Sequence, residues 1–292
     1  MDAVLHIKDI HYGSLPAQFL DIHIPVNIES GAPRPLLVFV HGGAWRSEDK
    51  SQHEQLAARL VLRTGCAVAV PNYRLTSREP RPPSDGGSSS PEYIHHPAHA
   101  HDILQALIFL ISAHDTPARG MYDPARLFLV GHSCGAHILA CLFLDSTPTP
   151  ELTPPNELMT ATRGIAVSEG IFDLDLLLTR FPEYRMWFIA NAFGDAPSYP
   201  QYDVARYPLR ADGEHIHWLV IHSRGDSLVD VGQAEKFYQH LCELGLESHN
   251  VAQKDWTSIE MEHNEMLKTK QYTDLVGDYF SNLTSEPSIS QN

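Results

Sequence analysis

The sequence predicts an α/β fold in which a mostly parallel central sheet carries helices on both faces. Short apolar runs alternate along the chain with longer segments of helical spacing, and this alternation is typical of βαβ units. The runs at residues 36–40 and 67–70 are apolar throughout, as expected of strands that are covered on both faces. Both observations favour an open sheet with chemistry at the carboxyl ends of its strands.

The length and composition fit one domain. We predict a single unit over residues 1–292, with a cap insertion at about 174–215 and a disordered tail after about 284. The hydrophobic content of 43% supports a core that needs no disulfide or metal. The four cysteines are scattered without a C-x-x-C pair, which is typical of reduced thiols.

The charge balance excludes some partners. A net charge of -15 disfavours nucleic acid and anionic membranes, both of which attract basic surfaces. The first residues show no secretory signal, and no apolar run reaches the ~20 residues that span a bilayer. We therefore expect a cytoplasmic enzyme that acts on a small molecule. The sequence is compatible with a homodimer.

The elements follow in order. Alternating polarity at residues 3–11 and 17–25 predicts a hairpin at an edge of the sheet. The later strands are predicted at residues 36–40, 67–71, 127–130, 164–168, 218–222 and 248–252. Helical spacing extends over residues 52–64, 93–113 and 231–245. Residues 78–91, rich in proline, glycine and serine, predict a surface loop.

The candidate nucleophile lies between a strand and a helix. Residues 131–135 read Gly-His-Ser-Cys-Gly directly after the apolar run at 127–130. A G-x-S-x-G in this position predicts a nucleophile elbow, a sharp turn that exposes the serine hydroxyl. Gly131 and Gly135 tolerate the backbone angles of such a turn. Ser133 is therefore the predicted nucleophile. The neighbouring Cys134 is the less favoured alternative, because the turn presents its central residue.

A second glycine motif follows the strand at 36–40. Its residues are His41, Gly42, Gly43, Ala44 and Trp45. A glycine pair after a strand can direct backbone N–H groups toward one point, which is what an oxyanion hole requires. We expect the N–H groups of Gly42, Gly43 and Cys134 to form that hole. An ordinary turn is the alternative interpretation.

An acid and a base complete the candidate site. Asp226 follows the strand at 218–222, and His263 lies in a polar loop before the last helix. Serine, acid and histidine in this chain order predict a catalytic triad of an open α/β fold. Asp173 is the second candidate for the acid, and Asp230 is expected to cap a helix instead. The other candidates for the base are His240 and His249.

Aromatic residues gather in the predicted cap, which suggests a pocket for an apolar or aromatic substrate. The candidate pocket residues are Trp45, Phe172, Trp187 and Phe193. His95 and His99 have a spacing that could hold zinc if both were helical. Pro97 predicts that the helix begins near it and leaves His95 outside, so we predict no metal.

Together these motifs resemble the α/β-hydrolase superfamily, and HGGAW with GHSCGAH is similar to the fungal kynurenine formamidase (arylformamidase) family. Residues 168–173 and 192–194 are similar as well. The resemblance implies the α/β-hydrolase fold, a Ser-His-Asp mechanism without a cofactor, and hydrolysis of N-formyl-L-kynurenine to kynurenine and formate in tryptophan catabolism.

The resemblance leaves alternatives open. Asn264 follows His263 where the family usually has an aromatic residue, and Tyr207-Pro208 replaces its usual Ser-Pro. A paralogue with another substrate and a carboxylesterase of small acyl or aryl esters are both compatible with these motifs. A non-catalytic ligand receptor would be expected to lack one of the three triad residues, all of which are present.

Overall fold

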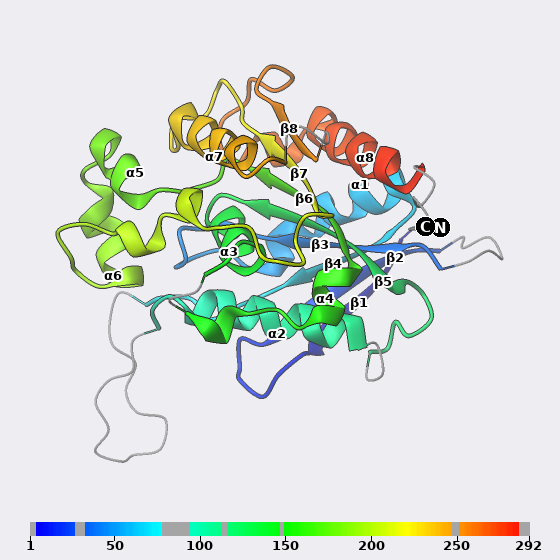
Figure 1. The fold of residues 1–292 in the computed structure, drawn as a ribbon. Coiled ribbons are helices and arrows are strands. Elements are labelled where there is room, and N and C mark those ends of the chain that lie inside the picture. The colour runs from blue at the N-terminus through cyan, green and yellow to red at the C-terminus, as the bar shows by residue number, and fades with distance from the viewer. Residues whose placement is uncertain are drawn as a thin grey trace, which may run out of the picture.

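An eight-stranded sheet forms the centre of the molecule in the computed structural model (Figure 1). The structure describes residues 4–26, 33–77, 94–112, 116–146, 149–246 and 251–285. The strand order is β1-β2-β4-β3-β5-β6-β7-β8. The strands are β1 (Val4–His11), β2 (Phe19–Pro25), β3 (Pro35–Val40), β4 (Ala67–Pro71), β5 (Asp123–His132), β6 (Thr162–Ser168), β7 (His217–Ile221) and β8 (Ala252–Asp255).

The sheet is parallel except at one edge. β1 pairs antiparallel with β2, and β2 pairs antiparallel with β4, whereas the pairs from β4 to β8 are parallel. Every residue of β3 and β4 is buried, which explains why these strands read as unbroken apolar runs. The predicted hairpin at an edge of the sheet is confirmed.

Register brings the ends of four strands to one level. Val40 of β3 lies opposite Gly131 of β5, and His132 lies opposite Ser168 of β6. Ser168 in turn lies opposite Ile221 of β7. The segments that follow these strands therefore meet at the same edge, although they are far apart in the sequence.

Helices cover both faces of the sheet, as predicted. The longer ones are α1 (Glu54–Thr64), α2 (Ala98–Ser112), α3 (Cys134–Phe143), α7 (Val231–Glu243) and α8 (Lys270–Ser285). α1 and α8 lie side by side and share one apolar cluster with the sheet (Figure 1). α2, α3 and α7 pack on the other face in a second cluster. The predicted fold class is therefore confirmed.

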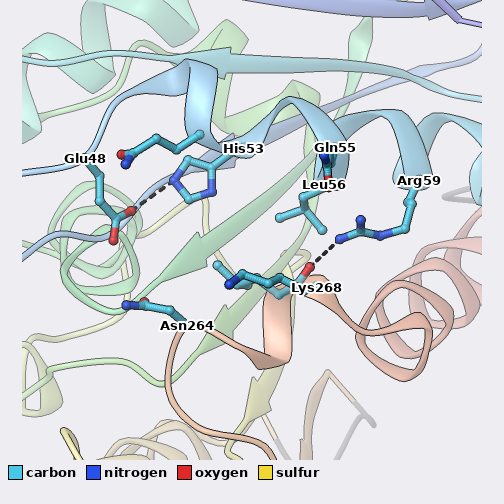
Figure 2. Close-up of a pocket in the computed structure, with 9 residues that line it drawn as sticks. Glu48, His53, Gln55, Leu56, Arg59, Asn264 and Lys268 are labelled. Atoms are coloured by element: carbon cyan, nitrogen blue, oxygen red, sulfur yellow. Dashed lines mark hydrogen bonds and ion pairs between the residues drawn. The ribbon is translucent and has the colours of Figure 1, made fainter.

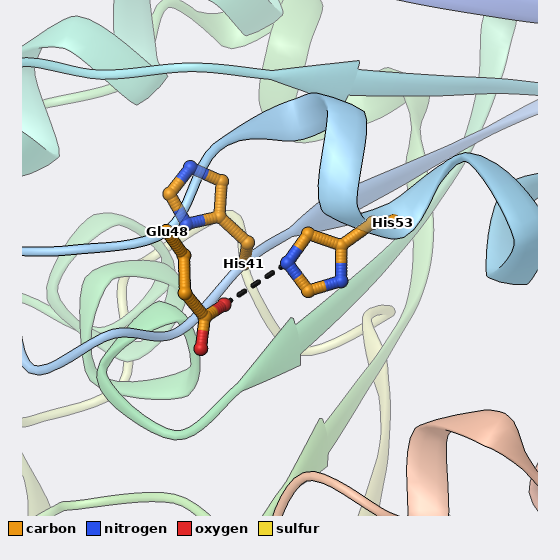
Figure 3. A group of neighbouring side chains, drawn as sticks. All are labelled: His41, Glu48 and His53. Carbon is orange, nitrogen blue, oxygen red and sulfur yellow. Dashed lines mark hydrogen bonds and ion pairs between the residues drawn. The ribbon is translucent and has the colours of Figure 1, made fainter.

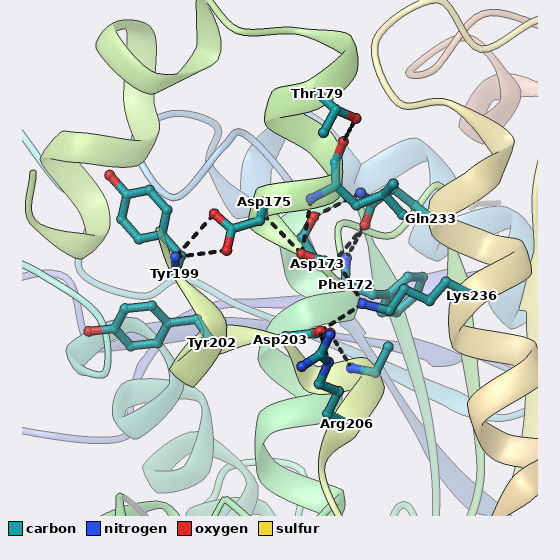
Figure 4. Close-up of polar contacts among 12 residues, drawn as sticks. Phe172, Asp173, Asp175, Thr179, Tyr199, Tyr202, Asp203, Arg206, Gln233 and Lys236 are labelled. Atoms are coloured by element: carbon teal, nitrogen blue, oxygen red, sulfur yellow. Dashed lines mark hydrogen bonds and ion pairs between the residues drawn. The ribbon is translucent and has the colours of Figure 1, made fainter. Parts of the chain in front are cut away.

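The segment between β6 and β7 contains several short helices. They are α5 (Leu174–Arg180), a π-helical turn at Arg185–Ile189, α6 (Ala190–Phe193) and two 3₁₀ turns at Pro200–Tyr202 and Val204–Arg206. α5 and α6 lie at one end of the sheet (Figure 1). Figure 4 shows how Lys236 of α7 binds both Asp173 and Asp203, which tie the insertion to the body of the molecule.

Some boundaries differ from the prediction. The last strand begins at Ala252 instead of 248, and residues 247–250 lie outside the described residues. α2 begins at Ala98, directly after Pro97, as the proline predicts. The predicted loop at 78–91 and the predicted tail, apart from its first residues, lie outside the described part of the chain.

Among the described residues, no helix is long and apolar enough to cross a membrane.

Candidate active site

Ser133 occupies a strained turn between β5 and α3. Its backbone angles are φ 55 and ψ -122, and positive φ is uncommon for a residue with a side chain. A Cβ on Gly131 would lie 2.8 Å from Cα of Ala136, and one on Gly135 would lie 2.3 Å from the carbonyl oxygen of Val40. Only glycine fits these two positions, so the motif residues are required by the packing of the turn.

His263 and Asp226 are joined by a hydrogen bond. Nδ1 of His263 donates to Oδ2 of Asp226 over 2.7 Å. The other carboxylate oxygen of Asp226 accepts from the backbone N–H groups of Leu228 at 2.7 Å and Val229 at 3.0 Å. Since Nδ1 of His263 is held in this way, Nε2 is left to exchange a proton. Ser133 and His263 line the same cavity.

The environment keeps Asp226 ionised. Burial alone would raise the pKa of its carboxyl, but hydrogen bonds from His263 and Glu169 outweigh that cost and hold the pKa well below its usual range. The side chain of Asp226 is 0% exposed. A buried, ionised carboxylate beside an imidazole fixes its tautomer and stabilises its protonated form.

The competing residues lie elsewhere or serve other purposes. Asp230 caps α7 by accepting from the backbone N–H of Gly232 at 3.0 Å, as predicted. Asp173 caps α5 and binds Lys236. Nε2 of His240 bonds to the carbonyl oxygen of Tyr207. His249 lies outside the described residues. Asp226 and His263 are therefore the acid and base that geometry favours.

The segment after β3 passes close to Ser133. A Cβ on Gly42 would lie 2.9 Å from Cβ of Ser133, and one on Gly43, where φ is 95, would lie 2.2 Å from the carbonyl oxygen of Ser47. Within the described residues, no acceptor is bonded to the backbone N–H of Gly42 or Gly43. Their free donors beside Ser133 agree with the predicted oxyanion hole, which remains a proposal.

The thiol of Cys134 anchors this segment. Its Sγ accepts a hydrogen bond from the backbone N–H of Trp45 at 3.2 Å and lies 3.6 Å from Oη of Tyr73. Burial raises the pKa of the thiol to about 12, so it stays protonated at neutral pH. A neutral, buried thiol is a poor nucleophile. Its contact with Trp45 could not be foreseen from the motif.

We expect Cys134→Ala to remain an active enzyme. The substitution removes one hydrogen bond to the segment after β3, which is typically worth about 1 kcal/mol, so kcat/KM should fall by no more than about tenfold. Steady-state kinetics on the same substrate for Cys134→Ala and Ser133→Ala would check this. An inactive Cys134→Ala beside an active Ser133→Ala would reverse the assignment.

Glu169 is a buried carboxyl that the sequence motifs did not single out. It follows β6, is 0% exposed and has a φ of 51. Its Oε1 accepts from the backbone N–H of Ser223 at 2.7 Å, and its Oε2 lies 3.1 Å from Nδ1 of His222. Burial and the hydrogen bond to Asp226 raise the pKa of Glu169 to about 11. Glu169 is therefore protonated and donates to the Asp226 carboxylate.

This protonation state predicts a pH dependence of stability. The pKa of Glu169 rises from 4.5 to about 11 on folding, so the unfolded chain binds fewer protons between these values. The contribution of Glu169 to the free energy of unfolding is then fully present below its pKa in the unfolded chain and is lost as pH rises toward its pKa in the folded protein. Glu169→Gln keeps a donor for Asp226 but cannot ionise. Its melting temperature should gain on that of the wild type as pH rises.

Thermal melts followed by circular dichroism at about pH 5, 7 and 9 measure this gain. A difference between Glu169→Gln and the wild type that stays constant over this range would show that Glu169 is already ionised in the folded state.

The cavity at Ser133 has a volume of about 400 Å³. Part of its wall comes from the segment after β3, part from the insertion and part from the triad. Six residues that represent these parts are Arg46, Glu48, Tyr184, Trp187, Phe188 and His263. The volume lies within the range of sites for small molecules.

Three of the four predicted pocket residues do not line this cavity. Trp187 does. Trp45 is fully buried and packs edge-on against Phe193, with ring centroids 4.8 Å apart. Phe172 stacks on Phe237 at 4.0 Å. These rings fill the interior between the insertion and the helices, so Trp45, Phe172 and Phe193, which were predicted as pocket residues, lie outside the wall of this cavity.

Two groups of side chains in the described residues have donor atoms within 4.8 Å of one another, as a metal site would. One is His41, Glu48 and His53 (Figure 3), and the other is Glu169, His222 and Asp226. A metal lies near the plane of each imidazole that binds it, yet the rings of His41 and His53 are stacked 5.7 Å apart at 10°. In the second group, Asp226 is bound to His263 and Glu169 is protonated. Neither geometry suits a metal.

The histidines before and within α2 are also separated by their contacts. His99 is 0% exposed, and its Nε2 lies 2.9 Å from Oγ1 of Thr76. Nδ1 of His95 bonds instead to the carbonyl oxygen of Asn191 in the insertion. The structure therefore does not bring His95 and His99 together as a pair of ligands.

Comparisons with known proteins agree with this architecture. Residues 20–152 match the family model described as BD-FAE. A kynurenine formamidase-like hydrolase of Fusarium equiseti is 29% identical over 190 residues, which are 61% of this chain and 60% of that protein. A kynurenine formamidase of Aspergillus versicolor is 25% identical over 243 residues, or 73% of this chain and 78% of that one.

The solved structures show a likeness over nearly the whole chain. An inhibited esterase B from Lactobacillus rhamnosis covers 98% of this chain and 88% of its own, with a TM-score of 0.73 and 16% sequence identity. At this identity the likeness concerns the fold alone.

Proposed function

Because this chain has the α/β-hydrolase fold and resembles kynurenine formamidases in sequence, we propose that it is a serine hydrolase that cleaves N-formyl-L-kynurenine to kynurenine and formate. The observation that carries the proposal is the hydrogen-bonded pair His263–Asp226 in one cavity with Ser133, which stands on the strained turn after β5. The reaction would belong to the kynurenine pathway of tryptophan catabolism.

The first half of the reaction forms a formyl-enzyme. Oγ of Ser133 attacks the formyl carbon while Nε2 of His263 accepts the hydroxyl proton. Asp226 stabilises the imidazolium that results. The C–N bond then breaks, and His263 returns the proton to the arylamine as kynurenine leaves.

The second half releases formate. Water attacks the formyl ester of Ser133, with His263 again as the base and then as the acid that protonates Oγ. In both halves the negative oxygen would be bound by the backbone N–H groups of Gly42, Gly43 and Cys134. Each such donor typically lowers the barrier by about 3 kcal/mol.

The shape of the cavity suits an aryl formamide. Tyr184, Trp187 and Phe188 of the insertion face the cavity and can contact an aromatic leaving group. A Cβ on Gly42 would lie 2.9 Å from Cβ of Ser133, so glycine allows this segment to approach the nucleophile closely.

The test is a comparison of purified enzyme on N-formyl-L-kynurenine and on p-nitrophenyl esters of increasing acyl length. We expect kcat/KM to be higher on N-formyl-L-kynurenine than on any of the esters. A much larger kcat/KM on the esters would refute the formamidase.

A carboxylesterase is the second candidate. Ile171, Leu228 and Val229 give the same cavity an apolar side that could hold an acyl chain. A kcat/KM that rises with acyl length from acetate to butyrate would favour this candidate, whereas a fall would favour the formamidase.

A cytoplasmic location and the oligomeric state stay predictions from the sequence.

A further inference from the structure

Two charged residues of the cavity have no part in the mechanism above. Arg46 and Glu48 are the side chains with permanent charges among the described residues that line the cavity with Ser133. Both belong to the turn that follows the glycine pair. A charge in a cavity that is otherwise rich in apolar groups is costly unless it is paired, so Glu48 calls for an explanation.

The backbone holds Glu48 in an uncommon conformation. Its φ is 74, in the left-handed region that residues with a side chain seldom adopt. Oε2 of Glu48 accepts a hydrogen bond from Nε2 of His53 at 2.9 Å. Within the described residues, its Oε1 has no hydrogen-bond donor, and the side chain is 18% exposed. One carboxylate oxygen is thus fixed while the other remains available.

Glu48 stands between two cavities. It and Asn264 line the cavity at Ser133 and also a second cavity of about 240 Å³. Figure 2 shows this second cavity, with the Glu48 carboxylate beside His53 and with Asn264 at the same end of the cavity. Glu48 therefore belongs to a wall that the active site shares with this second cavity.

The buried rings of His41 and His132 do not balance the charge on Glu48. Burial raises the pKa of Glu48, but the hydrogen bond from His53 and the nearby His132 outweigh it, so the pKa lies below its usual value. Burial lowers the pKa of His41 to about 4 and that of His132 to about 3, so both rings are neutral at pH 7. An ionised carboxylate in this setting attracts a cation.

We propose that Glu48 binds the ammonium group of the substrate, so that the enzyme selects aryl acyl compounds that carry an α-amino acid. The inference rests on the proposed function, because N-formyl-L-kynurenine has an ammonium group several bonds from its formyl carbon. Arg46 lies two residues earlier and donates a hydrogen bond to the carbonyl oxygen of Trp187. Its guanidinium supplies the charge that complements the carboxylate of the same amino acid.

The experiment uses two pairs of substrates whose members differ in the ammonium group alone. The first pair is N-formyl-L-kynurenine and its analogue without the α-amino group. The second is O-acetyl-L-tyrosine and 3-(4-acetoxyphenyl)propionate. kcat and KM are measured for the wild type, for Glu48→Gln and for Glu157→Gln, a control whose exposed side chain lies on α4 (Asn156–Ala161).

The wild type and Glu157→Gln should prefer the ammonium-bearing member of a pair by about 10- to 100-fold in kcat/KM. In Glu48→Gln this preference should fall to about threefold or less, mainly through a higher KM. Its kcat/KM on the members without ammonium should stay within about threefold of the wild type.

A preference that survives in Glu48→Gln overturns the inference. So does an equal loss on both members, which would mean that Glu48 supports the turn without contacting substrate. A wild type that cleaves the ester pair with the preference, but not the formyl pair, refutes the formamidase and supports the inference. A wild type that cleaves the formyl pair without preference supports the formamidase and overturns the inference about Glu48. A wild type that cleaves neither pair overturns both the formamidase and the inference.

Folding of Glu48→Gln is checked by its melting temperature. If that variant unfolds, Glu48→Asn replaces it, because asparagine also removes the charge and tolerates positive φ better than most residues. The same ratios of kcat/KM then decide the outcome.

Discussion

Replacing Ser133 with alanine is expected to lower kcat by about 10³- to 10⁶-fold while the protein stays folded. The hydroxyl is the group that attacks the carbonyl carbon, and neither His263 nor Asp226 can replace it. Alanine fits the turn as well as serine does, because both carry a Cβ at the same positive φ. The loss should therefore appear in kcat with little change in the melting temperature.

Ser112→Ala is the matched control for this variant. Ser112 is an exposed serine at the end of α2 that bonds to the carbonyl oxygen of Phe109. It should keep wild-type activity. Steady-state kinetics and thermal melts of both variants give the comparison, and full activity of Ser133→Ala would refute the site.

Asp226→Asn should lower kcat by about 10⁴-fold, the loss typical of this substitution in a triad. Asparagine can donate to Nδ1 of His263, which favours the tautomer that carries its proton on Nε2 and cannot accept the serine proton. It also removes the charge that stabilises the imidazolium. The backbone donors of Leu228 and Val229 can still bind the amide oxygen, so the fold should persist.

Asp230→Asn provides the matched control for this second variant. Asp230 lies four residues later and caps α7, and asparagine caps helices as well as aspartate does. Kinetics of the two variants should show a large loss for Asp226→Asn alone. A large loss in Asp230→Asn with normal activity of Asp226→Asn would show that the acid has been misassigned.

Much of the fold could be predicted because the local signals and the tertiary structure agree. Strands β3 and β4 are apolar on both faces, and Pro97 marks the start of α2. The elbow could be predicted because packing permits only glycine at 131 and 135. The pairing of Asp226 with His263 followed from chain order, since parallel strands bring their carboxyl ends to one edge.

The substrate cavity could not be predicted in the same way. The insertion consists of short helices and turns, so no long period in its sequence shows which aromatic residues face inward. Phe172 and Trp187 are both aromatic, yet one stacks on Phe237 and the other lines the cavity. The composition of this part of the chain shows how many aromatic rings it has, but not which of them face the cavity.

Two acidic residues were missed for a related reason. Glu169 lies beside Asp226 because β6 and β7 are neighbours in register, which the sequence does not show. Glu48 enters the cavity because its turn adopts positive φ at several residues, including Ala44 and Trp45. Such conformations depend on contacts with α3 that are distant in the sequence, as the bond from Trp45 to Cys134 illustrates.

Labelling by a serine-directed phosphonate tests the central claim most directly. We expect one adduct per chain in the intact mass, located on Ser133 by peptide mapping. The rate of labelling should fall sharply in Asp226→Asn, because the imidazole no longer activates the hydroxyl. An adduct on another residue, or labelling that persists unchanged in Ser133→Ala, would contradict the account.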